Sequence, residues 1–79
     1  MITVRYFAGA AEAAGTESEQ HEARTVGELL AAMTTAHPES LPVVLERCSL
    51  LVDGSRTGEP ASPLPDGAVV DVLPPFAGG

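Results

Sequence analysis

One segment near the middle of the chain limits the possible folds more than any other. The stretch TVGELLAAM begins with a capping box, because Glu28 follows three residues after Thr25. Its apolar side chains then recur at the spacing of one helical face: Val26, Leu29, Leu30 and Met33. We expect this helix to end near His37, because Pro38 disfavours helical geometry in the residue before it.

Strand patterns lie at both ends of the chain. The first seven residues, MITVRYF, alternate between two faces, as a half-buried strand does. The Ile2 side is the core face, so Phe7 points outward beside Arg5. The closing stretch AVVDVLP alternates in the same way, and Asp71 marks its solvent side, so Leu73 faces outward as well.

The other segments carry weaker patterns. An alanine-rich stretch after the first strand predicts two helical turns that stop at Gly15. The polar residues 18–23 predict an edge strand, and CSLLVDG predicts a strand closed by its Asp-Gly turn signal. A helical turn or two within 41–48 and a short strand at 55–57 complete the order.

These patterns predict an α+β fold in which a mixed sheet of about five strands has one main helix packed on one face. Seventy-nine residues leave room for one small core, built mainly from Val, Leu, Ile and Ala because only three residues are aromatic. We therefore expect a single domain over residues 1–79, with a flexible tail at 74–79.

Charge narrows the possible partners. The chain has eight Glu and three Asp but only four Arg and no Lys, for a net charge of −7. Such a chain repels phosphate backbones and anionic lipid, so we expect it to bind neither nucleic acid nor membrane. A basic protein partner is the natural complement. Without lysine, the chain can take part in isopeptide chemistry only as the donor.

The two terminal strands can lie side by side in the middle of the sheet. Phe7 and Leu73 would then meet on the face that the helix leaves open, with Phe76 just beyond. An open apolar patch with a charged rim is typical of a partner surface. A folded-back alanine-rich segment covering the patch is the structural alternative.

The ending VLPPFAGG predicts a projecting arm. Pro74 and Pro75 stiffen the exit from the last strand. Gly78 and Gly79 give the narrowest backbone available, which could thread into the active site of another protein. The terminal carboxylate is unreactive by itself, so it would need activation, for which an acyl adenylate made from ATP by a separate enzyme is the obvious route.

Nearly the whole chain resembles the ThiS/MoaD family of sulfur carriers, which are ubiquitin-like β-grasp proteins, and most closely the small subunits of molybdopterin synthase. The matching stretches are VRYFAGAAEAAGTE, TVGELLAAM, LLVDG and LPDGAVVDVLPPFAGG. The ending PP-x-x-GG and the FA…E…G segment are the most specific of them. The alanine-rich insert favours the molybdopterin branch over the shorter thiamine-pathway carriers.

The resemblance implies a division of labour between this chain and its partners. An adenylating enzyme related to ubiquitin activators would charge Gly79 with AMP, and a sulfur donor would convert it to a thiocarboxylate. The thiocarboxylated tail would enter the large subunit of molybdopterin synthase and pass sulfur to a pterin precursor. ATP would be consumed by the activating partner, with no cofactor bound by this chain, which is a sulfur-donating subunit without catalytic side chains. The candidate docking residues are Phe7, Arg56, Leu73, Pro75 and Phe76, where Arg56 takes a position that is aliphatic in some relatives.

Other functions stay open at this stage. Sulfur carriers for cysteine, thiamine or sulfur-containing natural products share the tail, and a ubiquitin-like modifier would donate Gly79 to lysines of target proteins. A plain interaction domain with a passive tail is a third alternative.

The remaining polar residues predict no further site. Cys48 lies on an apolar stripe, where a lone cysteine is a small buried hydrophobe, and its solitary thiol fits the cytoplasm. His21 and His37 are 16 residues apart without neighbouring ligands, so no metal site is expected. The acidic residues 17–22 are interpreted as a solvated edge. The glycines are spaced as turns, and none forms a phosphate-binding loop.

Overall fold

The computed structural model describes residues 1–75 of the chain. Five strands make one sheet: β1 (Ile2–Tyr6), β2 (Ser18–His21), β3 (Ser49–Val52), β4 (Ser55–Thr57) and β5 (Val69–Leu73). Three helices join them: α1 (Gly9–Ala14), α2 (Val26–Ala36) and α3 (Leu41–Leu45). Every element that the sequence pattern predicts is present, and the α+β prediction is confirmed. Within residues 1–75, none of the helices combines the length and the apolar character needed to span a membrane.

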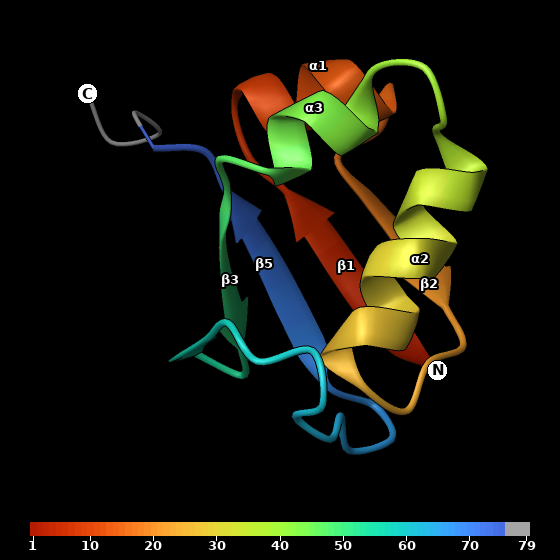
Figure 1. Ribbon diagram of the computed structural model, residues 1–79, viewed down its shortest axis with the longest axis vertical. Coiled ribbons are helices and arrows are strands. Elements are labelled where there is room, and N and C mark those ends of the chain that lie inside the picture. Colours follow the sequence, from red (N-terminus) through yellow and green to blue (C-terminus); the bar gives the residue numbers. More distant parts are fainter. Residues whose placement is uncertain (76–79) are drawn as a thin grey trace.

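The strand order is β2-β1-β5-β3-β4, with β5 at the centre (Figure 1). The first and last strands are neighbours, as predicted, and they run parallel with Tyr6 opposite Val72. All other neighbours are antiparallel. Because β1 and β5 are parallel, both end at the same edge of the sheet, and this edge is where the chain leaves β5.

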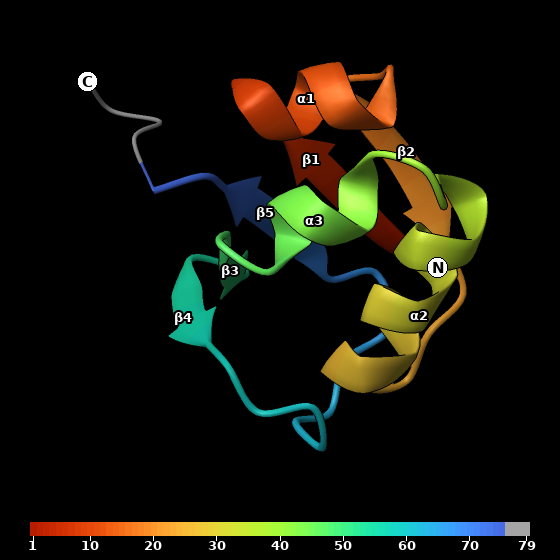
Figure 2. The ribbon, with the colours of Figure 1, turned by 45° about the horizontal axis from the view of Figure 1, so that its top comes forward.

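The core lies between one face of the sheet and the helices. In Figures 1 and 2, α2 crosses in front of the sheet, whereas α1 and α3 pack together near the end of β1. The inward side chains of β1 and β5 are fully or almost fully buried, and Leu29 and Met33 of α2 are completely buried against the same cluster. Burial of a side chain of this size contributes roughly 1.5–3 kcal/mol, so this apolar face, rather than helix propensity, stabilises α2.

Local signals set the ends of α2. The hydroxyl of Thr25 accepts the N–H of Glu28 at 3.2 Å, which confirms the predicted N-cap. The carboxylate of Glu28 accepts the N–H of Arg24 at 2.9 Å, one residue further out than the reciprocal bond of a capping box. Helical residues end at Ala36, with His37 as the C-cap before Pro38.

Two glycine turns complete the frame. Gly15 closes α1 in the left-handed conformation, at φ 74°, where a residue with a side chain would be strained. Asp53 and Gly54 both have positive φ, which is the geometry of the tight hairpin turn that the Asp-Gly pair predicts between β3 and β4. This hairpin places Arg56 opposite Leu51.

Candidate functional site

The sheet face that points away from the helices, called the outer face below, carries the candidate docking residues. Strand alternation brings Leu73 of β5 and Arg56 of β4 to this face. Phe7 directly follows β1, and its N–H donates to the carbonyl of Val72 at 3.2 Å, so Phe7 and Leu73 occupy neighbouring positions at the edge where β1 and β5 end. Phe7 is 37% exposed, and Leu73 is half-buried. The predicted meeting of these two positions is confirmed.

The backbone holds Phe7 in place from both sides. Besides its own bond to Val72, its carbonyl accepts the N–H of Ala10 at 3.0 Å, at the start of α1. The intervening Ala8 has φ 48° and ψ −124°, a conformation that costs a non-glycine residue on the order of 1–3 kcal/mol. The chain therefore turns sharply after Phe7, and α1 packs against α3 and buries Ala10 and Ala14 in the core.

An ion pair supports the aromatic ring. Arg5 donates through Nε and Nη2 to the two carboxylate oxygens of Asp71, at 2.6 and 2.9 Å. Asp71 is only 15% exposed, so the pair is partly shielded from solvent, and the bond to Asp71 raises the pKa of Arg5. The guanidinium carbon of Arg5 lies 5.8 Å from the ring centroid of Phe7, within cation–π range. Asp71 thus orients Arg5, and Arg5 borders the ring.

The predicted tail begins at this same edge. Pro74 is half-buried and Pro75 is exposed immediately beyond Leu73. The predicted residues Phe76, Gly78 and Gly79 lie outside the described part of the chain, as does most of the predicted flexible tail. The structure therefore brings Phe7, Leu73 and the start of the tail together, and it places Arg56 on the same face but two strands away from β5. The roles of these residues stay predictions.

Two of the pockets on the surface of residues 1–75 bear on the site. A shallow pocket of about 400 Å³ lies beside Phe7, and its lining includes Ala8, Ala11, Glu17 and Ser18. It adjoins the outer face, so a partner that covers Phe7 can also reach it.

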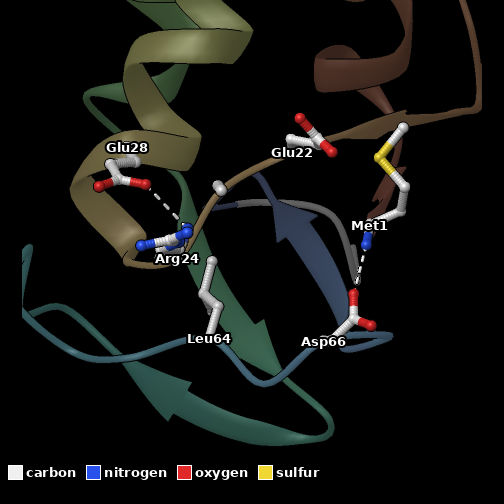
Figure 3. Close-up of a pocket in the computed structure, with 7 residues that line it drawn as sticks. Met1, Glu22, Arg24, Glu28, Leu64 and Asp66 are labelled. Atoms are coloured by element: carbon white, nitrogen blue, oxygen red, sulfur yellow. Dashed lines mark hydrogen bonds and ion pairs between the residues drawn. The ribbon is translucent and has the colours of Figure 1, made fainter.

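The larger of these two pockets, about 570 Å³, is shown in Figure 3. It is lined by the N-terminal Met1, by the segment before α2 and by Asp66, and its lining mixes both signs of charge. Thr3 pairs with Val69 at the start of both strands, so this pocket is at the opposite end of the sheet from Leu73. We assign it no part in the chemistry of the tail.

A polar cluster on the core side escaped the sequence analysis. The carboxylate of Glu19 lies 2.7 Å from the hydroxyl of Tyr6, 2.7 Å from Nε2 of His21 and 2.8 Å from Nε2 of His37. These residues come from β1, β2 and the C-cap of α2, so Glu19 ties an edge strand to the end of the main helix. Glu19 and His21 share one face of β2, a period-2 signal that could have paired them. Their contact with His37 is a product of the tertiary fold.

Hydrogen bonds decide the charge of Glu19. Burial alone would raise the pKa of this carboxyl, but the bonds from His21, Tyr6 and His37 outweigh burial, and the net effect lowers its pKa. Burial, followed by the bond to Glu19, raises the pKa of Tyr6, so the phenol stays protonated and donates. Within residues 1–75, no group of three or more His, Cys, Asp and Glu side chains is arranged to hold a metal ion.

This cluster predicts an acid-sensitive contribution to stability. Because the pKa of Glu19 is lower in the folded chain than in the unfolded chain, its contribution is present above the unfolded pKa and is lost as pH falls through the folded pKa. We expect Glu19→Gln to lower the free energy of unfolding at neutral pH and to flatten its decline on acidification. Urea unfolding across this pH range is the measurement, and Glu22→Gln, an exposed neighbour, is the matched control. Equal pH profiles for both variants would contradict the assignment.

The surroundings of Cys48 fit a structural rather than a reactive role. Its thiol donates to the carbonyl of Val44 at 3.1 Å, and burial raises its pKa. A thiol with a raised pKa is a poor nucleophile at neutral pH, in agreement with the structural interpretation of this residue.

Comparisons with known proteins place the chain in a family. A model described as the ThiS family matches residues 4–79. No curated protein matches the chain. SAMP1 from Haloferax volcanii is 25% identical, with a TM-score of 0.83, over 99% of this chain and 98% of that chain. A chain from the complex of subunits 1 and 2 of the molybdopterin-converting factor of Helicobacter pylori 26695 is 28% identical, with a TM-score of 0.77, over 99% and 97%.

A third structure is similar in fold. A chain of the BexX/CysO complex of Amycolatopsis orientalis has a TM-score of 0.83 over the full length of both chains, at 19% identity. The β-grasp prediction is confirmed by these likenesses, and two of the three relatives were solved in complex with a second protein. Since the family match covers nearly the whole chain and the fold agrees with it, this protein belongs to the ThiS family of ubiquitin-like sulfur carriers.

Proposed function

We propose that this protein is the sulfur-carrying small subunit of molybdopterin synthase. The observation that carries the proposal is the position of the tail: the chain leaves β5 at the edge of the outer face, directly beside Phe7 and Leu73. A partner that binds this face receives the tail at the same time. The family match extends to Gly79, so it includes the residue that the chemistry requires.

The chemistry at Gly79 has two steps, both on partner enzymes. The Gly79 carboxylate attacks the α-phosphate of ATP on an adenylating enzyme related to ubiquitin activators, which forms an acyl adenylate and releases pyrophosphate. A sulfur donor at the oxidation level of sulfide then displaces AMP and leaves a thiocarboxylate. This chain supplies the carboxylate and the docking face, whereas ATP is bound and consumed by the partner.

The acceptor step distinguishes the molybdopterin branch. In our proposal the thiocarboxylated tail enters the large synthase subunit, and hydrolysis of the thioacid accompanies sulfur transfer to a pterin precursor. The alanine-rich helix α1 between β1 and β2 and the 28% identity to the Helicobacter pylori protein support this branch. We place the protein in the cytoplasm, because its single free thiol fits a reducing compartment.

A second function has support from a specific likeness. SAMP1, a small archaeal modifier protein, has the same fold at 25% identity, which favours a protein modifier that donates Gly79 to lysines of its targets. Intact mass separates the two functions. A sulfur carrier gains one oxygen-to-sulfur exchange after incubation with an adenylating enzyme, ATP and a sulfur source, whereas a modifier forms protein adducts that survive thiol reagents.

A further inference from the structure

The outer face has a charge balance opposite to that of the whole chain. Among the strand side chains that point to this face, three are charged: Arg5, Asp71 and Arg56. The strands therefore bring two of the four arginines to this face but only one of the eleven Asp and Glu side chains. At physiological salt, charges more than about 8 Å apart are largely screened, so a partner in contact with this face responds to these three groups more than to the net charge of −7.

Arg56 carries the net positive charge of the face. Arg5 is neutralised by Asp71 in the bidentate pair described above. The guanidinium of Arg56 instead donates to a neutral hydroxyl, Ser49 Oγ, at 3.1 Å, and no carboxylate of residues 1–75 lies within ion-pair distance of it. A guanidinium has five N–H donors, so most of those of Arg56 are free to bind another group.

The bond from Arg56 to Ser49 holds the guanidinium near the end of β5, where the tail begins. Ser49, to which it is bonded, pairs with Leu73, and Arg56 itself pairs with Leu51. A partner surface that covers Leu73 and extends over the neighbouring Ser49 therefore also removes water from the guanidinium of Arg56. A desolvated charge without a counter-ion is strongly unfavourable, so the interface needs an acceptor at this point.

We propose that the outer face docks on an apolar partner surface that presents an aspartate or glutamate to Arg56. The planar fork of the guanidinium suits a carboxylate in bidentate geometry. This inference rests on the proposed function, in that we take the ATP-dependent adenylating enzyme as the partner. It replaces the basic partner that net charge alone suggests with one that is locally acidic.

Two charge reversals test the proposal. Arg56→Glu and Arg24→Glu change the net charge by the same amount, but Arg24 lies beside the larger pocket, at the far end of the sheet (Figure 3). The probe is the purified adenylating enzyme of the same organism, assayed by ATP–pyrophosphate exchange with this protein as the varied substrate. We expect Arg56→Glu to lower kcat/KM by about tenfold or more, chiefly through KM, and Arg24→Glu to change it by less than about twofold. Thermal unfolding of both variants checks that the fold is intact.

The outcomes separate the inference from the function on which it rests. Exchange with the unmodified protein together with a loss confined to Arg56→Glu supports the inference and the adenylation step of the proposed function. If Arg56→Glu is as active as the unmodified protein, or if both variants lose activity equally, Arg56 has no carboxylate partner and the inference is overturned while the function stands. If the unmodified protein supports no exchange, the proposed function and the inference both fail.

Discussion

Deletion of Gly79 is expected to reduce sulfur transfer by at least about 100-fold while leaving the fold unchanged. One residue of extended chain spans about 3.3 Å. In the shortened chain, the terminal carboxylate therefore stops about that much farther from the α-phosphate of ATP. A displacement of only about 1 Å can already cost a factor of roughly 100 in rate. The fold is unaffected because β5 ends at Leu73, well before the deleted residue. Thiocarboxylate formation on the adenylating enzyme is the quantity to measure.

The control for this deletion is stability. The free energy of unfolding of the shortened chain should equal that of the full chain, so a loss of activity cannot come from unfolding. The proposed chemistry is wrong if the chain without Gly79 still transfers sulfur at the original rate. A plain interaction domain with a passive tail predicts instead no thiocarboxylate on either chain, and a function that the deletion leaves unchanged.

Truncation of Phe7 to Ala is expected to weaken docking by about 2 kcal/mol, or roughly 30-fold in affinity. Aromatic side chains near the centre of an interface contribute binding energies of this size. The backbone of Phe7 is already fixed by bonds to Val72 and Ala10, so binding costs little conformational entropy at this residue. Titration of the adenylating enzyme with each variant, with affinity as the readout, is the measurement.

Val43→Ala is the matched control for Phe7→Ala. Val43 is also an exposed apolar residue, at 65%, but it lies in α3 rather than on the outer face. Both substitutions remove apolar surface without changing charge. We expect Val43→Ala to bind within about twofold of the original affinity, as surface changes away from an interface do. Equal losses for the two variants would mean that the outer face is not the docking face.

Much of the fold could be predicted because its signals are local. Alternation in MITVRYF and AVVDVLP placed Val4 and Val70 in the core, and both are completely buried. Thr25 could be identified as an N-cap because its partner is only three residues away. The Asp-Gly turn was recognisable because few residues tolerate positive φ at two successive positions.

The contacts that could not be predicted are those between residues far apart in the sequence. The bond between Glu19 and His37 spans 18 residues and exists only because β2 lies next to the end of α2. The bidentate pair of Arg5 and Asp71 spans 66 residues and needs β1 and β5 to be in their observed register. Alternation shows which face a side chain occupies, but it does not show which residue lies opposite on the next strand.

The candidate site also contains both kinds of feature: some follow from local patterns, and others depend on distant pairing. Phe7 and Leu73 could be placed on the open face from period 2 and the assumed pairing of the end strands. The bond between Arg56 and Ser49, by contrast, came only with the β3–β4 hairpin, and it shows a charge at the tail edge that composition does not predict. In our proposal, the partner surface that faces Arg56 is therefore acidic, whereas net charge alone suggests a basic partner.

The central claim is that Gly79 accepts sulfur as a thiocarboxylate. The most direct measurement is the intact mass of the protein, followed by fragmentation of its C-terminal peptide, after incubation with the adenylating enzyme, ATP and a sulfide source. Samples without ATP, and the chain that lacks Gly79, serve as controls. We expect the mass gain of one oxygen-to-sulfur exchange, located at Gly79 and present only with ATP. An unchanged mass in a reaction where the enzyme does release pyrophosphate in response to this protein would contradict the account.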